Sequence, residues 1–233
     1  MKETIICFGD SLTEGLPGSS FLDYLGDSRK YENHGRGGDT LRGVSSRLRN
    51  HLLEHTIETL IVLVGTNDIL YDYLLNRSRL WEKVASNSIY AKGVPCQSPL
   101  AYGEQFSEML DLVGDCEKVM ISIPCIGEDV TSEVNQKVDS YNEELKRLSV
   151  EFNAKFVDFN RWEKDYLTGR TINPDFVLGK NPGVTLTDIV VPRIGELDLR
   201  LSKRRGLHLT IDGVHLNQVG AKALGRLVSE VLD

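Results

Sequence analysis

The stretch TIICFGDSLTEG, residues 4–15, changes abruptly from an apolar run to glycine, acid and hydroxyl. Residues 4–8 predict a β-strand, and Gly9, Asp10 and Ser11 follow where that strand ends. Glycine permits a tight turn, so we expect a turn that presents the Ser11 hydroxyl and leaves the Ser11 backbone N–H available as a donor. Polar groups at the end of a buried strand point to a chemical role for this turn.

Four further runs predict strands of the same sheet. The clearest is LIVLV, residues 60–64, because its five apolar side chains do not alternate with polar ones. Such a run suits a strand covered on both faces, as in a parallel sheet between helices. The other runs are KYEN at 30–33, VMISI at 119–123 and KFVDF at 155–159.

Helical patterns lie between and after the predicted strands. Apolar residues recur at helical spacing after Thr40, a candidate N-cap, within residues 132–152, and after Asn217, a second candidate N-cap. The alternation of strands and helices implies right-handed crossovers and a mostly parallel, doubly wound α/β sheet. The chain has 233 residues, and we expect one domain over residues 1–233.

Two stretches interrupt the alternation and are expected to be insertions in this domain. Residues 69–98 are rich in Tyr, Trp and Arg, and residues 160–207 contain several Gly and Pro. Connections beyond about 12–15 residues usually carry function or structure of their own. The aromatic residues of the first stretch either line an acyl pocket or pack the insertion onto the domain. In the second stretch, alternation at 184–191 and 196–202 on either side of PRIG predicts an added β-hairpin.

Short polar turns that contain glycine follow the predicted strands. They read FGDSLTEG after the first strand, NHGRGGDT after the second, GTND after the third, and DGVHLN beyond the second insertion. The carboxyl ends of parallel strands meet at one edge of a sheet, and ligands bind there where the strand order reverses. We therefore expect these four turns to converge.

The converging turns contain the groups that acyl transfer requires. A serine hydroxyl needs a neighbouring base, and the base needs a third group that holds its tautomer. Ser11, His215 and Asp212 are the candidates, with Asp212 three residues before His215. A tetrahedral intermediate also needs donors for its oxyanion. The candidate donors are the backbone N–H groups of Ser11 and Gly38 and the side-chain amide of Asn67.

In this order, GDSLTEG, NHGRGGDT, GTND and DGVHLN resemble the four sequence blocks of the GDSL or SGNH hydrolases, from Phe8 to Asn217. The resemblance implies a three-layer, flavodoxin-like fold with about five parallel strands. It implies Ser11 as nucleophile, Gly38 and Asn67 as oxyanion donors, His215 as base and Asp212 as its orienting group, without metal or other cofactor. The insertions are longer than a compact member needs, so substrate preference does not carry over.

We expect a serine esterase that cleaves a small-molecule carboxylic ester through an acyl-enzyme. Deacetylation of a sugar, cleavage of a lysophospholipid or thioester, and transfer of the acyl group to another acceptor all stay open. The alternative is a catalytically silent module on the same fold that binds a carbohydrate or another ligand.

Charge and composition restrict the classes of binding partner and the cellular location to be expected. The formal net charge of −7 argues against nucleic acid. No window approaches the roughly 18–20 apolar residues of a membrane span, and the first apolar run is shorter than the apolar core of a signal peptide, about 7–15 residues. The four cysteines lack CxxC spacing. These features predict a cytoplasmic protein with free thiols.

Two other motifs invite different interpretations. HLLEH, residues 51–55, fits the H-x-x-E-H pattern of one metalloprotease class. His51 and His55 are also expected at the C-terminal end of a helix, where histidine favours the helix dipole, and no third ligand follows at a characteristic spacing. The basic run RLSKRR, residues 200–205, is either a solvated face or a patch that steers an anionic substrate.

Overall fold

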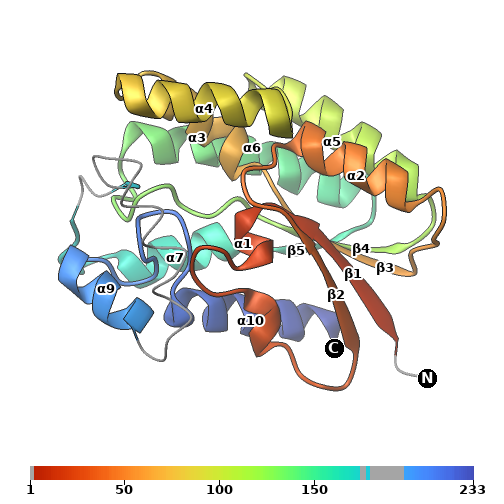
Figure 1. The fold of residues 1–233 in the computed structure, drawn as a ribbon. Coiled ribbons are helices and arrows are strands. Elements are labelled where there is room, and N and C mark those ends of the chain that lie inside the picture. Colours follow the sequence, from red (N-terminus) through yellow and green to blue (C-terminus); the bar gives the residue numbers. More distant parts are fainter. Residues whose placement is uncertain (1–2, 174–176, 179–196) are drawn as a thin grey trace.

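The computed structural model describes residues 3–173, 177–178 and 197–233, and centres on one five-stranded sheet (Figure 1). All strand pairs are parallel and the order is β2-β1-β3-β4-β5. The strands are β1 (Thr4–Gly9), β2 (Lys30–Gly35), β3 (Thr59–Leu63), β4 (Glu117–Ile121) and β5 (Lys155–Val157). The predicted doubly wound α/β fold is confirmed, and each predicted strand is present with no end shifted by more than two residues.

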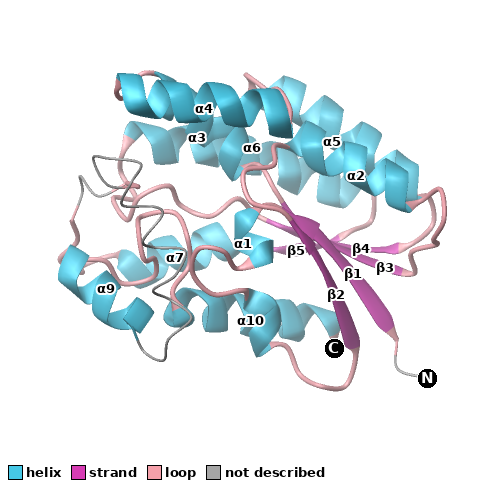
Figure 2. Ribbon diagram, viewed as in Figure 1, coloured by secondary structure: helices cyan, strands magenta, loops and turns pink. Residues whose placement is uncertain are grey.

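Helices cover both faces of the sheet, as Figure 2 shows. One layer contains α2 (Leu41–His51), α3 (Thr66–Leu75), α4 (Arg79–Lys92), α5 (Pro99–Val113) and α6 (Glu133–Glu151). The other contains α1 (Ser11–Glu14), the 3₁₀ helix η1 (Phe21–Tyr24), α7 (Phe159–Leu167), α9 (Leu197–Arg205) and α10 (Gln218–Leu232). Along β1, Ile6 and Phe8 enter the first core whereas Ile5 and Cys7 enter the second. The two layers therefore bury the two faces of each strand.

The strand order reverses at β1, and this reversal determines which edge of the sheet the predicted site occupies. From β1 the chain goes to β2 on one side and then to β3 on the other. Gly9, the last residue of β1, pairs with Gly35 of β2 and with Leu63 of β3. The three strands thus end at one level, and the turns that follow them open onto the same edge.

Gly9 is required for close packing rather than for an unusual backbone angle. It is still a strand residue and is not among the glycines with positive φ. A Cβ atom there would lie 2.4 Å from the Leu63 carbonyl oxygen and 2.1 Å from Thr13 Oγ1. The expectation of a glycine-dependent turn therefore has a different physical cause, which is the close approach of β3 and α1.

The predicted hairpin in the second insertion is wrong in its second half. Residues 197–205 form helix α9, and the first half at 184–191 lies outside the described residues. Asp198 and Ser202, one helical turn apart, form the buried face of α9 and are polar. The Asp198 carboxylate accepts the Gln218 backbone N–H at 2.8 Å, and Ser202 Oγ accepts Asn217 Nδ2 at 3.0 Å. The leucines that alternate along this segment therefore do not mark its buried face.

The first insertion contains most of α3 and all of α4. Thr40 and Asn217 cap α2 and α10 as predicted. Across the described ranges, no helix combines the length and apolar character needed to cross a bilayer. All described strands belong to one sheet, and a single domain over residues 1–233 stays a prediction.

Gly9→Ala is expected to lower the free energy of unfolding by about 1–3 kcal/mol, because the new methyl group overlaps a backbone oxygen that cannot withdraw. Gly26→Ala is the matched control, since a Cβ there meets nothing within 4 Å, and its change is expected to stay within about 0.5 kcal/mol. Urea denaturation of the two variants measures the difference. Equal stability of the two would contradict the packing argument.

Candidate active site

Ser11 lies at the start of helix α1, directly beyond β1. Asp10 caps this helix, and its Oδ1 accepts the Leu12 backbone N–H at 2.9 Å. Ser11 is therefore the first helical residue, and it is 7% exposed. This is the strand-to-helix turn in which the sequence predicted it.

His215 and Asp212 reach Ser11 from the loop before α10. His215 Nε2 lies 3.0 Å from Ser11 Oγ, and His215 Nδ1 lies 2.7 Å from Asp212 Oδ2. The structure thus joins the three predicted residues in one continuous hydrogen-bonded chain. With its proton on Nδ1, the ring donates to Asp212 and leaves Nε2 free to accept the proton of Ser11.

The Asp212 carboxylate is buried but favours its charged form. Its Oδ1 also accepts the backbone N–H groups of Val214 at 3.0 Å and His215 at 2.8 Å. Burial by itself raises the pKa of Asp212, but the charge and hydrogen bonds of His215 and the Val214 N–H outweigh burial and lower it. An ionised carboxylate in this position is able to orient the ring and to stabilise positive charge on it.

Glu128, which the sequence analysis did not single out, holds the approach to this loop. Its buried carboxylate accepts the backbone N–H groups of His208, Leu209 and Thr210 at 2.7, 2.8 and 3.0 Å, and the Thr210 hydroxyl at 2.8 Å. Four donors from three consecutive residues converge on one side chain. Glu128 therefore sets the path of the chain just before Asp212.

The loop after β2 brings Gly38 to the same edge. A Cβ atom on the neighbouring Gly37 would lie 3.9 Å from Ser11 Cβ, so this loop lies beside the serine. Gly38 has a φ of +80°, which favours glycine. Within the described ranges, the structure records no acceptor for the backbone N–H groups of Ser11 and Gly38.

Asn67 lies in the first turn of α3, where the sequence placed it in the turn after the third strand. Its Nδ2 donates to the Asp39 carbonyl oxygen at 2.9 Å and to Asp10 Oδ2 at 3.4 Å. The amide therefore bridges the loop after β2 and the residue before Ser11. All five predicted site residues lie in these turns at one edge of the sheet.

Arg47, also missed by the sequence analysis, ties together the ends of β1 and β2. Its guanidinium donates to the carbonyl oxygens of Gly9 at 2.9 Å and His34 at 2.7 Å, and to Asp39 Oδ2 at 2.6 Å. Since Asp39 is buried, this ion pair is only partly screened by solvent. Arg47 thus connects the strand that carries Ser11 with the loop that carries Gly38.

Two buried acids have raised pKa values, namely Asp10, which precedes Ser11, and Asp68, which follows Asn67. Burial raises the pKa of Asp10 to about 7, with smaller opposing effects from a backbone N–H and from His215. Burial also raises the pKa of Asp68 to about 6, opposed by hydrogen bonds from the backbone N–H groups of Cys96 and Leu41. Protonation of Asp10 near pH 7 removes a negative charge from the residue that precedes Ser11.

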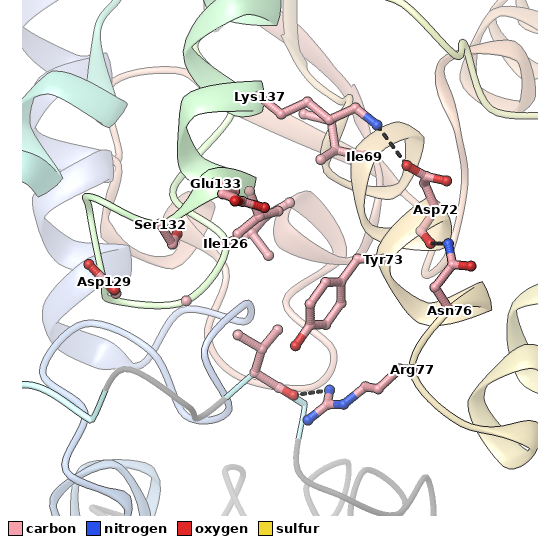
Figure 3. A pocket seen from close by; sticks show the side chains of 13 residues that line it. Ile69, Asp72, Tyr73, Asn76, Arg77, Ile126, Asp129, Ser132, Glu133 and Lys137 are labelled. Carbon is pink, nitrogen blue, oxygen red and sulfur yellow. Dashed lines mark hydrogen bonds and ion pairs between the residues drawn. The ribbon is translucent and has the colours of Figure 1, made fainter.

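A pocket of about 650 Å³ lies between α3 and the start of α6 (Figure 3). Gly127 lines this pocket and its N–H donates to the Gly213 carbonyl oxygen at 2.5 Å. Ile69, two residues after Asn67, lines it from α3. Apolar side chains and charged groups share the wall, and they include Ile126, Val134, Tyr73, Asp72, Glu133 and Lys137. The pocket therefore offers both apolar contact and polar groups, and its described lining does not include Ser11, Asn67, Asp212 or His215.

The histidines of the HLLEH motif pack in a ring cluster at the end of α2. The centroids of His51 and His55 are 4.7 Å apart, and His51 also contacts the rings of His34 and Phe8. Burial, together with His34 and His55, lowers the pKa of His51. The described part of the chain contains no group of three or more His, Cys, Asp or Glu residues arranged to hold a metal ion.

The basic run lies on α9, with three cations in its last turn, where they favour the helix dipole. Arg200, Lys203 and Arg204 are exposed. The Arg205 guanidinium donates to the Ile211 carbonyl oxygen at 2.7 Å, next to Asp212. One member of the run therefore supports the loop before His215, while the exposed members fit a solvated face.

A flavodoxin-like sheet with a serine, a histidine and an aspartate joined at its carboxyl edge is typical of an ester-hydrolysing enzyme. The model of the GDSL-like Lipase/Acylhydrolase family matches residues 7–223. The chain therefore belongs to the GDSL-like lipase/acylhydrolase family and is an ester-hydrolysing enzyme. No curated protein sequence matches it significantly.

Solved structures with the same fold are distant in sequence. A member of the lipolytic protein G-D-S-L family from Veillonella parvula has 18% identity and a TM-score of 0.62, over 98% of this chain and 97% of that one. A lipase/acylhydrolase from Enterococcus faecalis has 17% identity and a TM-score of 0.60, over 98% and 94%. A variant acetyl xylan esterase from Geobacillus stearothermophilus has 15% identity and a TM-score of 0.61, over 99% and 92%. At 15–18% sequence identity, the structural similarity to these proteins establishes the fold alone.

Glu128→Gln is expected to lower the free energy of unfolding by about 1.5–3 kcal/mol, because a charged acceptor is lost and the new amide group faces a backbone donor. Glu143→Gln, on the exposed face of α6, is the control and is expected to stay within about 0.5 kcal/mol of the parent. Urea denaturation compares the two. A Glu128→Gln protein as stable as the control would show that the four contacts do not hold this loop.

Proposed function

We propose that this enzyme cleaves a carboxylic ester through an acyl-enzyme formed on Ser11, with His215 as general base and acid and Asp212 as its orienting group. The observation that carries the proposal is the hydrogen-bonded chain from Ser11 Oγ through the His215 ring to Asp212. A serine hydroxyl is a weak nucleophile until a base takes its proton. Nε2 at 3.0 Å is within the range for that transfer.

Acylation follows from these positions. As the Ser11 proton moves to His215 Nε2, the Ser11 oxygen forms a bond to the carbonyl carbon and the carbonyl oxygen becomes an oxyanion. The bond from carbon to the alcohol oxygen then breaks, and the leaving alcohol takes the proton from Nε2. Asp212 stabilises the positive charge on the ring between these two transfers.

Deacylation repeats the sequence with water. His215 Nε2 takes a proton from a water molecule, and the resulting hydroxide attacks the acyl carbon. When this second tetrahedral intermediate collapses, Ser11 leaves with the proton from Nε2 and the carboxylic acid is released. The same base therefore serves both halves of the reaction.

The oxyanion is stabilised by three donors, namely the backbone N–H groups of Ser11 and Gly38 and the Asn67 amide. The two N–H groups have no acceptor within the described part of the chain. The Asn67 amide keeps its shorter bond to Asp39, and its longer bond to Asp10 at 3.4 Å is the one that an oxyanion replaces. Donors held in place before the reaction need no reorganisation when charge develops.

The pocket beside the loop of residues 212–215 holds part of the ester substrate in this proposal. Its wall includes Ile69 of α3, the helix that carries Asn67, and Gly127, which is bonded to Gly213. A site of this size suits a group larger than acetyl.

Labelling with a fluorophosphonate tests the nucleophile. The parent protein is expected to react with one equivalent of probe and Ser11→Ala with none, because the probe forms a covalent bond with an activated serine. Ser20→Ala is a control, since Ser20 Oγ donates to the Thr13 carbonyl oxygen instead of facing a base. Absence of labelling in the folded parent protein would favour the silent binding module.

Asn67→Ala is expected to lower kcat on a p-nitrophenyl ester by about 10²–10³-fold with little change in KM, because it removes one oxyanion donor. Asn142→Ala is a matched control, since the Asn142 amide also bonds backbone groups, the N–H and carbonyl of Ile123, at 2.7 and 2.9 Å. Steady-state kinetics compares the two. An unchanged kcat in Asn67→Ala would remove Asn67 from the mechanism.

A further inference from the structure

The Tyr71 hydroxyl lies against the loop that carries Gly38. Tyr71 is on α3, one helical turn after Asn67, and is 4% exposed. Its Oη donates to the Gly38 carbonyl oxygen at 2.5 Å. A Cβ atom on Gly38 would lie 2.9 Å from this oxygen, so the hydroxyl packs closely against the glycine.

Gly38 has few other restraints: the Asp39 N–H, in the same peptide as the Gly38 carbonyl, donates to the Arg36 carbonyl oxygen at 3.2 Å, and the described residues include no acceptor for the Gly38 N–H. On one side of it, the Gly37 N–H donates to Glu14 Oε2 at 2.6 Å. On the other side, the Asp39 carbonyl oxygen accepts the Asn67 amide. Gly38 has no side chain and occupies a region of φ in which glycine moves freely. The Tyr71 hydroxyl therefore restrains a glycine whose peptide groups have few other bonds among the described residues.

We propose that Tyr71 is a positioning residue that directs the Gly38 backbone N–H toward the substrate oxyanion. The inference rests on the proposed function, in which Gly38 is an oxyanion donor. Helix α3 then contributes to the oxyanion site in two ways. The Asn67 amide is a direct donor, and the Tyr71 hydroxyl positions a second donor, the Gly38 N–H. Tyr71 does not touch the reacting atoms.

The first insertion supplies this contact. Burial raises the pKa of Tyr71, with a smaller opposing effect from nearby Ser88 of α4, so the Tyr71 hydroxyl remains a neutral donor. Helix α4 also ends against this loop, since the Lys92 carbonyl oxygen accepts the Thr40 hydroxyl at 3.3 Å. Residues 69–98 thus brace the oxyanion loop from outside the sheet.

The test compares Tyr71→Phe with Tyr141→Phe. Tyr141 is the matched control because its buried hydroxyl also donates to a backbone carbonyl oxygen, that of Cys96, at 2.8 Å, and its ring packs in the same core. Both changes keep the ring and remove one hydroxyl, so their losses of stability are expected to be similar, about 1 kcal/mol each. Only Tyr71→Phe is expected to lower kcat, by roughly 10–100-fold, because it leaves the donor in place but poorly aimed.

Three further readouts separate positioning from general damage. KM is expected to stay within twofold of the parent value, and the acid side of the pH profile of kcat/KM is expected not to shift, since the pair of Ser11 and His215 is unchanged. Binding of a trifluoromethyl ketone, which mimics the tetrahedral intermediate, is expected to weaken by about the same factor as kcat. Ser88→Ala, which perturbs the hydroxyl without touching the core, is expected to lower kcat by a smaller factor.

A Tyr71→Phe enzyme with the kcat of Tyr141→Phe would overturn the inference. So would a loss of kcat that both variants share, or one accompanied by a shifted pH profile. Failure of the proposed function is recognised separately, because the parent protein would then not react with the fluorophosphonate at all.

Discussion

The hydrogen bond between Ser11 Oγ and His215 Nε2 joins residues that are 204 positions apart in the chain. Neither residue can reach the other unless the first strand and the last loop arrive at the same edge of the sheet. The parallel pairing of β1 with β2 and β3 aligns three strand ends at Gly35, Gly9 and Leu63. The last loop is held at this edge by backbone bonds, from the Ser19 N–H to the Leu216 carbonyl oxygen at 2.9 Å and from the Gly127 N–H to the Gly213 carbonyl oxygen. The fold therefore sets the distance between Ser11 Oγ and His215 Nε2, on which the proposed proton transfer depends.

Holding that distance requires buried polar groups with nearly complete sets of partners. Glu128 accepts four donors before Asp212. Arg47 joins the ends of β1 and β2 to Asp39, and Asp68 accepts the backbone N–H groups of Leu41 at 2.9 Å and Cys96 at 2.8 Å. A buried polar group without partners is costly, so satisfied networks of this kind favour one arrangement of the chain over others. The loops at the site are thus positioned by hydrogen bonds as much as by apolar packing.

Much of this arrangement could be predicted from the sequence, because the signals are local. The apolar run of β3 indicates a buried parallel strand, and the four polar turns follow from the topology. Ser11, Gly38, Asn67, Asp212 and His215 stand in those turns.

The supporting residues could not be found in the same way. Glu128 acts through contacts 80 to 82 positions away, and Arg47 reaches Gly9, 38 positions before it; nothing in their immediate neighbours signals these contacts. The segment that forms helix α9 was predicted as a strand because its leucines alternate, whereas its buried face consists of Asp198 and Ser202. Packing contacts at Gly9 also depend on a neighbour, Leu63, that only the fold brings close. Contacts between residues far apart in the chain are therefore the part of the structure that could not be predicted from the sequence.

A crystal structure of the protein after reaction with an alkyl fluorophosphonate tests the central claim most directly, because the phosphonyl oxygen takes the place of the oxyanion. The account predicts a covalent bond from phosphorus to Ser11 Oγ, with that oxygen about 2.7–3.1 Å from the backbone nitrogens of Ser11 and Gly38 and from Asn67 Nδ2. His215 Nε2 should remain within hydrogen-bond distance of Ser11 Oγ. An adduct on another residue, or a phosphonyl oxygen directed away from Gly38 and Asn67, would contradict the account.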